Sequence, residues 1–226
     1  MDDRRPTILE VVAAQCMKYT ASMGYVRVCM PANEFQLVTP RLTLRAVQFS
    51  DRDFFYRLYS DWQVAQYLVR TPAPFTEAHA QEFIDEAVLG LQQGHTYTLV
   101  IEDKRLNRSI GIITLRIPSL DPHYPEAWRE EDCGLGILGY SILPSEWGKR
   151  YASESAQQMV DFAFDDMHLD SIQASPIKTN SASRRLLERL GFTIAEADIL
   201  EEPLHGGPPQ LGDCYVLHRS QVRTQY

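Results

Sequence analysis

One stretch of the sequence combines residue types that suit the binding of an anion. Residues 138–154, LGYSILPSEWGKRYASE, predict a strand end, a break at Pro144, a short loop and the start of a long helix. The first turn of a helix presents unpaired N–H groups and the positive end of the helix dipole. Gly148 would let an anion approach the backbone, and Lys149 and Arg150 would add positive charge. The stretch therefore predicts a cradle for a phosphate or diphosphate; the alternative is a plain strand-to-helix turn with solvated basic residues.

The residues before and within the predicted strand include groups that can move protons. Glu130, Glu131 and His123 fall in an irregular, proline-containing stretch at 118–134, and Ser141 falls in the strand. Carboxylates and histidine serve as general bases, and a hydroxyl passes protons directly or through water. These four residues are the candidate catalytic groups, with solvated loop charges as the alternative for the first three. Three other residues are further candidates for proton transfer: Asp132, Tyr140 and Ser175.

Hydrophobic periodicity predicts the elements that would position these groups. Apolar residues at three- and four-residue spacing predict helices after Ser50 or Asp51, from Thr76 to Gly94, and at 152–164 and 181–190. Alternating or continuous apolar runs predict strands at 37–47, 96–102, 110–117, 135–143, 171–175, 192–200 and 213–219.

The order of these elements predicts one domain. Strands and helices are mixed without strict alternation and without an internal repeat, which is typical of a single α+β or α/β domain over residues 35–226. Residues 1–34 offer two turns of amphipathic helix around Ile8–Ala13 and little else. We interpret them as an N-terminal extension, mobile or loosely docked, with a functional arm as the alternative.

Composition narrows the classes of function. The chain has 22 Lys+Arg against 30 Asp+Glu, a formal net charge of −8, which argues against a dedicated nucleic-acid binder. The four scattered cysteines form no CxxC pair, and predict reduced thiols, no metal site and a cytoplasmic location. No apolar run approaches the roughly 20 residues of a membrane span, and no GxxxxGK[ST] phosphate loop is present.

Four motifs in order resemble the GCN5-related N-acetyltransferase (GNAT) superfamily, particularly its ribosomal-protein-acetyltransferase-like branch. Residues 138–154 resemble its acetyl-CoA-binding motif, and TPRLTLR at 39–45 resembles its opening strand. Gly111 falls where its hairpin strand often has glycine, and NSASRRLLERLGF at 180–192 resembles its Asn-x-x-Ser helix. The resemblance covers residues 35 to about 220 and implies a mixed, mostly antiparallel sheet of about six to seven strands flanked by about four helices.

The resemblance also implies a co-substrate, acetyl-CoA, and the residues that hold it. Backbone groups at Ile142 and Leu143 would bind the pantetheine arm as an added strand does. Asn180 and Ser183 would lie along the same arm; their alternatives are a helix N-cap and an ordinary first-turn residue. Backbone N–H groups would hold the diphosphate, from Trp147, Gly148, Lys149, Arg150, Tyr151 and Ala152.

Two departures from the family pattern affect the mechanism. Arg150 stands where the family usually has glycine; we expect a helical conformation there, so that arginine is tolerated and pairs with a phosphate. Leu187 replaces the tyrosine that protonates the leaving thiolate in many members, and Ile137 replaces a glutamate frequent in the branch.

The implied reaction is transfer of an acetyl group from acetyl-CoA to a primary amine by direct attack in a ternary complex. The acceptor would be a small-molecule amine or a peptide or protein amine, and the enzyme a monomer or homodimer. Acidic residues from Glu126 to Asp132 favour a cationic acceptor, and four aromatic residues either line its pocket or cover the core: Trp62, Tyr67, Tyr124 and Trp128. The alternatives are another acyl-CoA or non-acetyl chemistry, and a CoA-binding domain without turnover.

Overall fold

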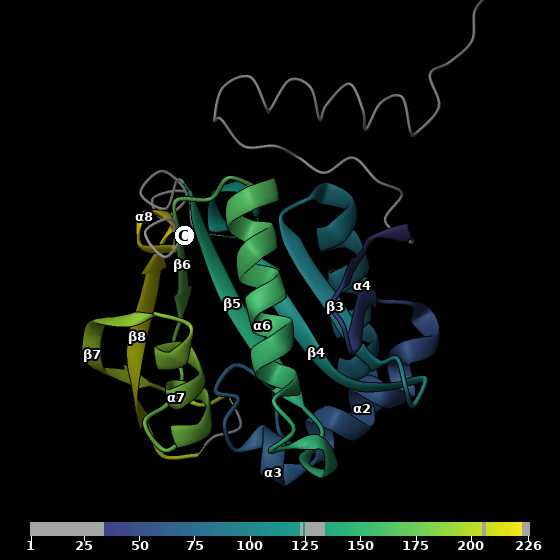
Figure 1. Ribbon diagram of the computed structural model, residues 1–226. Coiled ribbons are helices and arrows are strands. Elements are labelled where there is room, and N and C mark those ends of the chain that lie inside the picture. Colours follow the sequence, from purple (N-terminus) through teal and green to yellow (C-terminus); the bar gives the residue numbers. More distant parts are fainter. Residues whose placement is uncertain (1–33, 123, 125–133, 205–206, 223–226) are drawn as a thin grey trace, which may run out of the picture.

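A mixed eight-stranded sheet organises the chain (Figure 1). The computed structural model describes residues 34–122, 124, 134–204 and 207–222. The strand order is β1-β2-β3-β4-β5-β6-β8-β7, and every neighbouring pair is antiparallel except β5 and β6. The strands are β1 (Gln36–Val38), β2 (Leu42–Ala46), β3 (Thr96–Asp103), β4 (Arg108–Arg116), β5 (Leu135–Ile142), β6 (Ser171–Ala174), β7 (Thr193–Glu201) and β8 (Gln210–His218).

Helices connect the strands, and capping residues mark both ends of the longest one, α4. The α-helices of the described residues are α2 (Arg52–Ser60), α3 (Trp62–Ala65), α4 (Glu77–Gln93), α6 (Tyr151–Asp161), α7 (Ser181–Arg189) and α8 (Arg219–Val222). The Thr76 hydroxyl accepts from the His79 N–H at the start of α4, and Gly94 ends that helix with φ 72°. A π-helical turn, Phe162–Asp166, extends α6.

Helices cover both faces of the sheet because the strand side chains alternate between two cores. On β3, Leu99 and Ile101 belong to the larger core, which α6 and α7 complete, whereas Val100 belongs to the smaller core under α2 and α4. Figure 1 shows α6 lying across the centre of the sheet, beside β5. This packing fixes the start of α6 close to the end of β5, where the predicted cradle lies.

The predicted fold class is confirmed, with two differences in detail. The sheet has eight strands rather than six or seven, and the described residues form six α-helices rather than four. One added strand arises because the predicted strand 37–47 is broken by a turn: β1 ends at Val38, and the Leu42 carbonyl accepts from the Thr39 N–H over 3.0 Å. In the described part of the chain, no helix is both long and apolar enough to cross a membrane.

The predicted division into an extension and a domain is not tested. Residues 1–33 of the predicted extension lie outside the described residues, as does most of the irregular stretch at 118–134. The division at residue 34 therefore stays a prediction.

Candidate functional site

The site centres on β5, whose two edges are paired to different extents. In the described part of the chain, β5 pairs with β4 from Ile137 to Ile142 but with β6 only from Leu135 to Ile137. Alternate residues of a strand direct their main-chain groups to opposite sides. Because the Leu143 N–H donates to Ile110 on β4, the polar groups of Leu138, Tyr140 and Ile142 face the gap between β5 and β6. An extended ligand in this gap would find backbone donors and acceptors on one wall.

The predicted cradle corresponds to the loop that follows the end of β5. Pro144–Glu146 forms one 3-10 turn, Gly148 is left-handed with φ 77°, and α6 begins at Tyr151. The first helical bond runs from the Glu154 N–H to the Arg150 carbonyl over 3.0 Å, so the N–H groups of the first turn point out of the helix. A Cβ placed on Gly148 would meet no atom within 4 Å. The loop therefore has open space on the side of Gly148 where a side chain would project.

Trp147 joins the cradle to the strand. Its indole Nε1 donates to the Ile142 carbonyl over 2.8 Å, and its backbone N–H donates to Pro144 over 3.2 Å. The sequence predicts this N–H as a diphosphate donor, but it is already engaged within the protein. The open donors therefore begin at Gly148, and Ile142 turns only its N–H freely toward the gap.

Arg150 does not have the expected conformation. A helical position is predicted there, but Arg150 is left-handed, with φ 63° and ψ 18°, at the N-cap of α6. That prediction is wrong because the chain enters α6 through two left-handed residues, Gly148 and Arg150. The same conformation explains why the family has glycine here, since a left-handed non-glycine residue costs about 1–2 kcal/mol. The side chain of Arg150 is exposed beside the cradle.

A buried carboxylate binds one basic residue of the loop and one of β4. Glu146 is 2% exposed, and its carboxylate accepts from Arg108 and from the Lys149 ammonium, the latter over 2.8 Å. The sequence predicts Lys149 as positive charge for a phosphate, but its ammonium already has a partner. Arg150 is therefore the better candidate for direct charge pairing with a ligand.

Contacts from distant strands anchor the first turn of α6. The Glu154 carboxylate accepts from the Thr39 hydroxyl over 2.5 Å and from Arg41 Nε over 2.6 Å. The Tyr151 hydroxyl donates to the buried Asp103 over 2.5 Å, and this hydrogen bond raises the pKa of Tyr151 and lowers that of Asp103. The side chain of Tyr151 is thus structural, while its backbone N–H belongs to the cradle.

The start of α7 faces β5 across the gap. Asn180 is the N-cap of α7, and its Oδ1 accepts from the Ser183 N–H over 3.1 Å. This cap leaves both donors of the amide Nδ2 for another partner. The Ser183 hydroxyl shares a hydrogen bond of 2.8 Å with the Tyr140 hydroxyl of β5. Two predicted residues, Asn180 and Ser183, therefore lie together with Tyr140, whose part the sequence left open.

Burial changes the ionisation of two tyrosines at this site. It raises the pKa of Tyr140 to about 12, against the opposing effect of the bond to Ser183. It also raises the pKa of Tyr59 to about 12, although a hydrogen bond with Ser141 lowers it. Both side chains therefore stay neutral and able to donate a proton throughout the neutral pH range.

These raised values predict how the protein responds to alkali. Tyr59 and Tyr140 have folded pKa values above the unfolded value of about 10. Their contribution to the free energy of unfolding is therefore full below pH ~10 and is lost as the pH rises toward ~12. We expect Tyr59 and Tyr140 of the folded protein to ionise about two pH units late in a phenolate absorbance titration, beside Tyr151, whose pKa the hydrogen bond to Asp103 also raises. Tyr59→Phe and Tyr140→Phe should each remove one late step. A titration in which every tyrosine ionises together near pH ~10 contradicts this account.

The predicted catalytic residues divide into two groups. Ser141 is 8% exposed on β5, and its hydroxyl bonds to Tyr59 of α2. His123, Glu130 and Glu131 lie outside the described residues, so their part stays a prediction. Within the described residues, no group of three or more His, Cys, Asp or Glu side chains could hold a metal ion.

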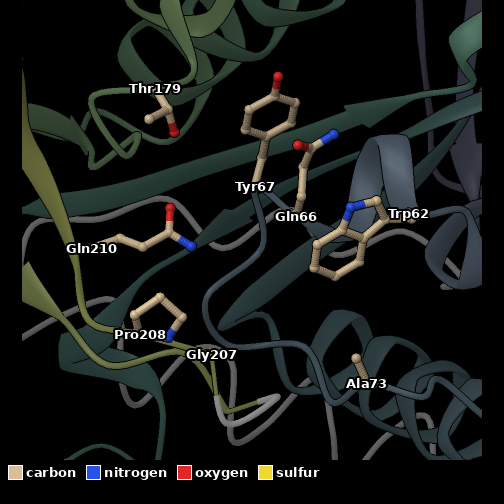
Figure 2. Close-up of a pocket in the computed structure, with 8 residues that line it drawn as sticks. All are labelled: Trp62, Gln66, Tyr67, Ala73, Thr179, Gly207, Pro208 and Gln210. Atoms are coloured by element: carbon tan, nitrogen blue, oxygen red, sulfur yellow. The ribbon is translucent and has the colours of Figure 1, made fainter.

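A cavity of about 540 Å³ lies between the segment that follows α2 and the loop that precedes β8 (Figure 2). Two of the four predicted aromatic residues, Trp62 and Tyr67, line it, and Trp128 lies outside the described residues. The sequence did not single out the polar residues of its wall, because isolated glutamines carry no pattern. The remaining lining residues are Gln66, Ala73, Thr179, Gly207, Pro208 and Gln210.

Together, the gap, the cradle and the two helix N-termini place a strand edge with few partners beside the first turns of α6 and α7, an arrangement suited to an extended ligand with an anionic end. The family model described as "Acetyltransferase (GNAT) domain" matches residues 41–193, which span all of these features. The chain belongs to the GNAT acetyltransferase family. Members of this family use acetyl-CoA, whose pantetheine and diphosphate correspond to the extended part and the anionic end of such a ligand.

Relatives and solved structures agree with the GNAT assignment. The chain is 28% identical over 159 residues to the uncharacterised N-acetyltransferase p20 of Bacillus licheniformis, covering 69% of this chain and 81% of p20. Its fold resembles the ribosomal-protein-S5-alanine acetyltransferase of Vibrio fischeri, with a TM-score of 0.67 and 16% identity over 82% of this chain and 97% of that one. It also resembles the spermidine N-acetyltransferase of Vibrio cholerae solved with CoA and spermine, with a TM-score of 0.66 and 21% identity over 82% and 99% of the two chains.

This GNAT domain lacks the two proton-transfer residues usual in its family. Leu187 is fully buried in the larger core, so nothing at that position faces the gap. Ile137 is aliphatic and sits on β5, where the strand still pairs with both neighbours. Proton transfer in this chain therefore depends on other groups.

Proposed function

We propose that this protein transfers an acetyl group from acetyl-CoA to a primary amine in a ternary complex, without a covalent enzyme intermediate. The observation that carries the proposal is the gap-facing edge of β5, which leads directly into the cradle at Gly148–Ala152. Acetyl-CoA supplies an acyl group activated as a thioester. The remaining requirements are binding, orientation, polarisation of the carbonyl and movement of protons, and these fall to the protein.

Binding uses backbone groups along the gap and charge at its end. The main-chain groups of Leu138 and Tyr140 would pair with the amides of the pantetheine arm, as an added strand does, in place of the predicted Leu143, whose N–H already donates to Ile110. The N–H groups from Gly148 to Ala152 would hold the diphosphate, with the Arg150 guanidinium as a charge partner. The Nδ2 of Asn180 would donate to the arm from the opposite wall. Holding donor and acceptor in one orientation supplies about 7–11 kcal/mol of barrier reduction.

The reaction also needs a donor to the acyl oxygen and a proton for the sulfur. The Ile142 N–H, which faces the gap, is suited to donate to the acyl oxygen as negative charge develops there. As the new C–N bond forms and the C–S bond breaks, the amine loses one proton and the sulfur gains one. The neutral Tyr140 hydroxyl, bonded to Ser183, is a candidate proton donor among the described residues at the gap. A free α-amine, with a pKa of about 8, needs little help in losing its proton, and His123, Glu130 and Glu131 are the candidates for stronger bases.

A second function has one observation in its favour. Because Leu187 and Ile137 replace both usual proton-transfer residues, the same scaffold could bind CoA and transfer a different acyl group, or not turn over at all. The cytoplasmic location suggested by the scattered cysteines and the choice between monomer and homodimer stay predictions.

Calorimetric titration with acetyl-CoA tests the proposed site. The native protein should bind at micromolar affinity, and Asn180→Ser should weaken binding about tenfold, since serine keeps the helix cap but lacks the amide donors. Arg150→Gly should raise the free energy of unfolding by about 1 kcal/mol by removing left-handed strain. The same variant should weaken binding about fivefold by removing a charge.

The opposite pattern would contradict the proposal. If the Arg150→Gly variant binds acetyl-CoA and the native protein does not, the fold has kept the shape of the site, but Arg150 prevents the native protein from binding the co-substrate. If acetyl-CoA binds but no amine in a broad panel releases CoA, the domain is a CoA-binding module without turnover.

A further inference from the structure

A buried carboxylate on β8 lies beside the segment that leads to Asn180. Asp213 is 1% exposed, and its backbone N–H donates to the Pro176 carbonyl over 3.2 Å. The preceding residue, Gly212, approaches the same segment so closely that a Cβ there would lie 3.3 Å from the Pro176 carbonyl oxygen. The chain just before Asn180 is therefore held against β8.

Two cations on either side of Asn180 converge on the Asp213 carboxylate. The Lys178 ammonium, which precedes Asn180, lies 3.4 Å from Oδ1 of Asp213. The Arg184 guanidinium, which follows Asn180 on α7, lies 3.3 Å from Oδ2. The backbone N–H of Arg184 also donates to the Asn180 carbonyl over 3.2 Å, which joins the two residues directly. One buried carboxylate thus holds both the approach to Asn180 and the first turn of α7.

An irregularity in β7 supplies the third partner of this carboxylate. The register between β7 and β8 shifts between Glu196 and Ile199, and Asp198 within this bulge is left-handed with φ 60°. The Asp198 N–H donates to Asp213 over 3.1 Å, and the Asp198 carboxylate pairs with Lys178 over 2.5 Å. The bond from the Asp198 N–H, together with the cations, lowers the pKa of Asp213, although burial alone would raise it. Asp213 is therefore charged at neutral pH, and bulges are frequent beside functional sites.

Resting on the proposed binding of acetyl-CoA, we infer that Asp213 is a positioning residue that holds the Asn180 amide toward the pantetheine arm. On the side of the gap, the start of α7 is joined to β5 by the hydroxyl pair of Tyr140 and Ser183. On the other side, Asp213 holds it through the two cations. Without the charge of Asp213, these cations lose a buried partner and the start of α7 can shift. The cradle at Gly148–Ala152 belongs to α6, so we expect the effect to be confined to the arm.

Calorimetric titration with CoA and with adenosine 3′,5′-bisphosphate, which lacks the pantetheine arm, tests this separation. Asp213→Asn keeps the size of the side chain but leaves only one oxygen to accept hydrogen bonds. We expect it to weaken CoA binding about fivefold and to leave binding of the bisphosphate within about twofold of native. Arg184→Gln removes one cation at a partly exposed position and should weaken CoA binding about threefold. The matched control, Glu188→Gln, changes an exposed carboxylate of α7 and should leave both ligands within about twofold of native.

A double-mutant cycle tests whether Asp213 acts through Asn180. In the Asn180→Ser background, Asp213→Asn should weaken CoA binding by no more than a further factor of about two, because the amide donors are already absent. A second measurement needs no ligand. Hydrogen exchange of the Ser183 N–H, which the Asn180 side chain caps, should quicken about tenfold in Asp213→Asn and stay unchanged in Glu188→Gln.

Three results would overturn the inference and leave the proposed co-substrate in place. They are additive losses in the double-mutant cycle, equal weakening of CoA and of the bisphosphate in Asp213→Asn, and unchanged exchange at Ser183. A native protein that binds neither ligand overturns the proposed co-substrate and this inference together. Binding of CoA without turnover overturns only the proposed transfer.

Discussion

Gly111→Ala should lower the free energy of unfolding by about 2–3 kcal/mol and reduce turnover about 100-fold. A Cβ at this position on β4 would lie 2.5 Å from the Ser141 carbonyl oxygen and 2.5 Å from the Ile142 side chain. Because Gly111 and Ile142 are register partners, the clash can be relieved only by moving the end of β5 away from β4. That end carries the N–H proposed to polarise the acyl group. Urea unfolding and steady-state kinetics measure the two effects.

Gly139→Ala is the matched control for this substitution. Gly139 lies on β5 itself, yet a Cβ there would meet no atom within 4 Å. Its unfolding free energy should stay within about 1 kcal/mol of native, because only the flexibility of the unfolded chain changes. Equal destabilisation by the two substitutions would show that the flexibility of glycine, rather than the close approach of the strands, explains the loss of stability in Gly111→Ala.

Glu154→Gln should lower the unfolding free energy by about 1–2 kcal/mol and weaken acetyl-CoA binding several-fold. The carboxylate joins the start of α6 to the turn between β1 and β2 through Thr39 and Arg41. The estimate is modest because the Arg41 side chain is 47% exposed. Chemical unfolding measured beside calorimetric titration separates loss of stability from loss of the cradle.

The contribution of the Glu154 carboxylate to the free energy of unfolding should decrease as the pH falls. Burial alone would raise the pKa of Glu154, but the hydrogen bonds from Thr39 and Arg41 outweigh it and lower the pKa below 4.5. The stabilisation is therefore full above the usual carboxyl pKa and is lost as the pH falls through the lowered value. The stability difference between native and Glu154→Gln should shrink between about pH 6 and pH 3. Glu86→Gln, which changes an exposed glutamate of α4, is the matched control and should leave the free energy of unfolding within about 0.5 kcal/mol of native.

Local patterns predicted the elements around the site well. The strand, the break at Pro144 and the helical face at 152–164 follow from periodicity, and Asn180 is where a helix N-cap is expected. These features depend on residues close together in sequence, where propensity and capping act directly. The family resemblance placed them in one fold before any contact was known.

The features that the sequence did not predict depend on contacts between distant residues. Arg150 is left-handed because the strand end and α6 fix the loop between them, which overrides the preference of arginine itself. The Tyr140–Ser183 bond joins residues 43 positions apart, and the Arg41–Glu154 bond joins residues 113 apart. No periodicity marks such partners. The polar residues of the cavity wall were not predicted for the same reason, since Gln66 and Gln210 line one cavity only after the sheet has formed.

The short pairing between β5 and β6 also divides the sheet into two blocks. Three register pairs at Leu135–Ile137 join the first five strands to the last three, although one hydrophobic core runs beneath both. The last three strands and α7 are therefore the natural unit for sub-global opening, with faster amide hydrogen exchange than the first five. A molecule bound along the gap would contribute hydrogen bonds to both sides of this seam. Binding of the co-substrate should then slow amide hydrogen exchange even in strands that do not contact the co-substrate. The bound domain would open as one cooperative unit.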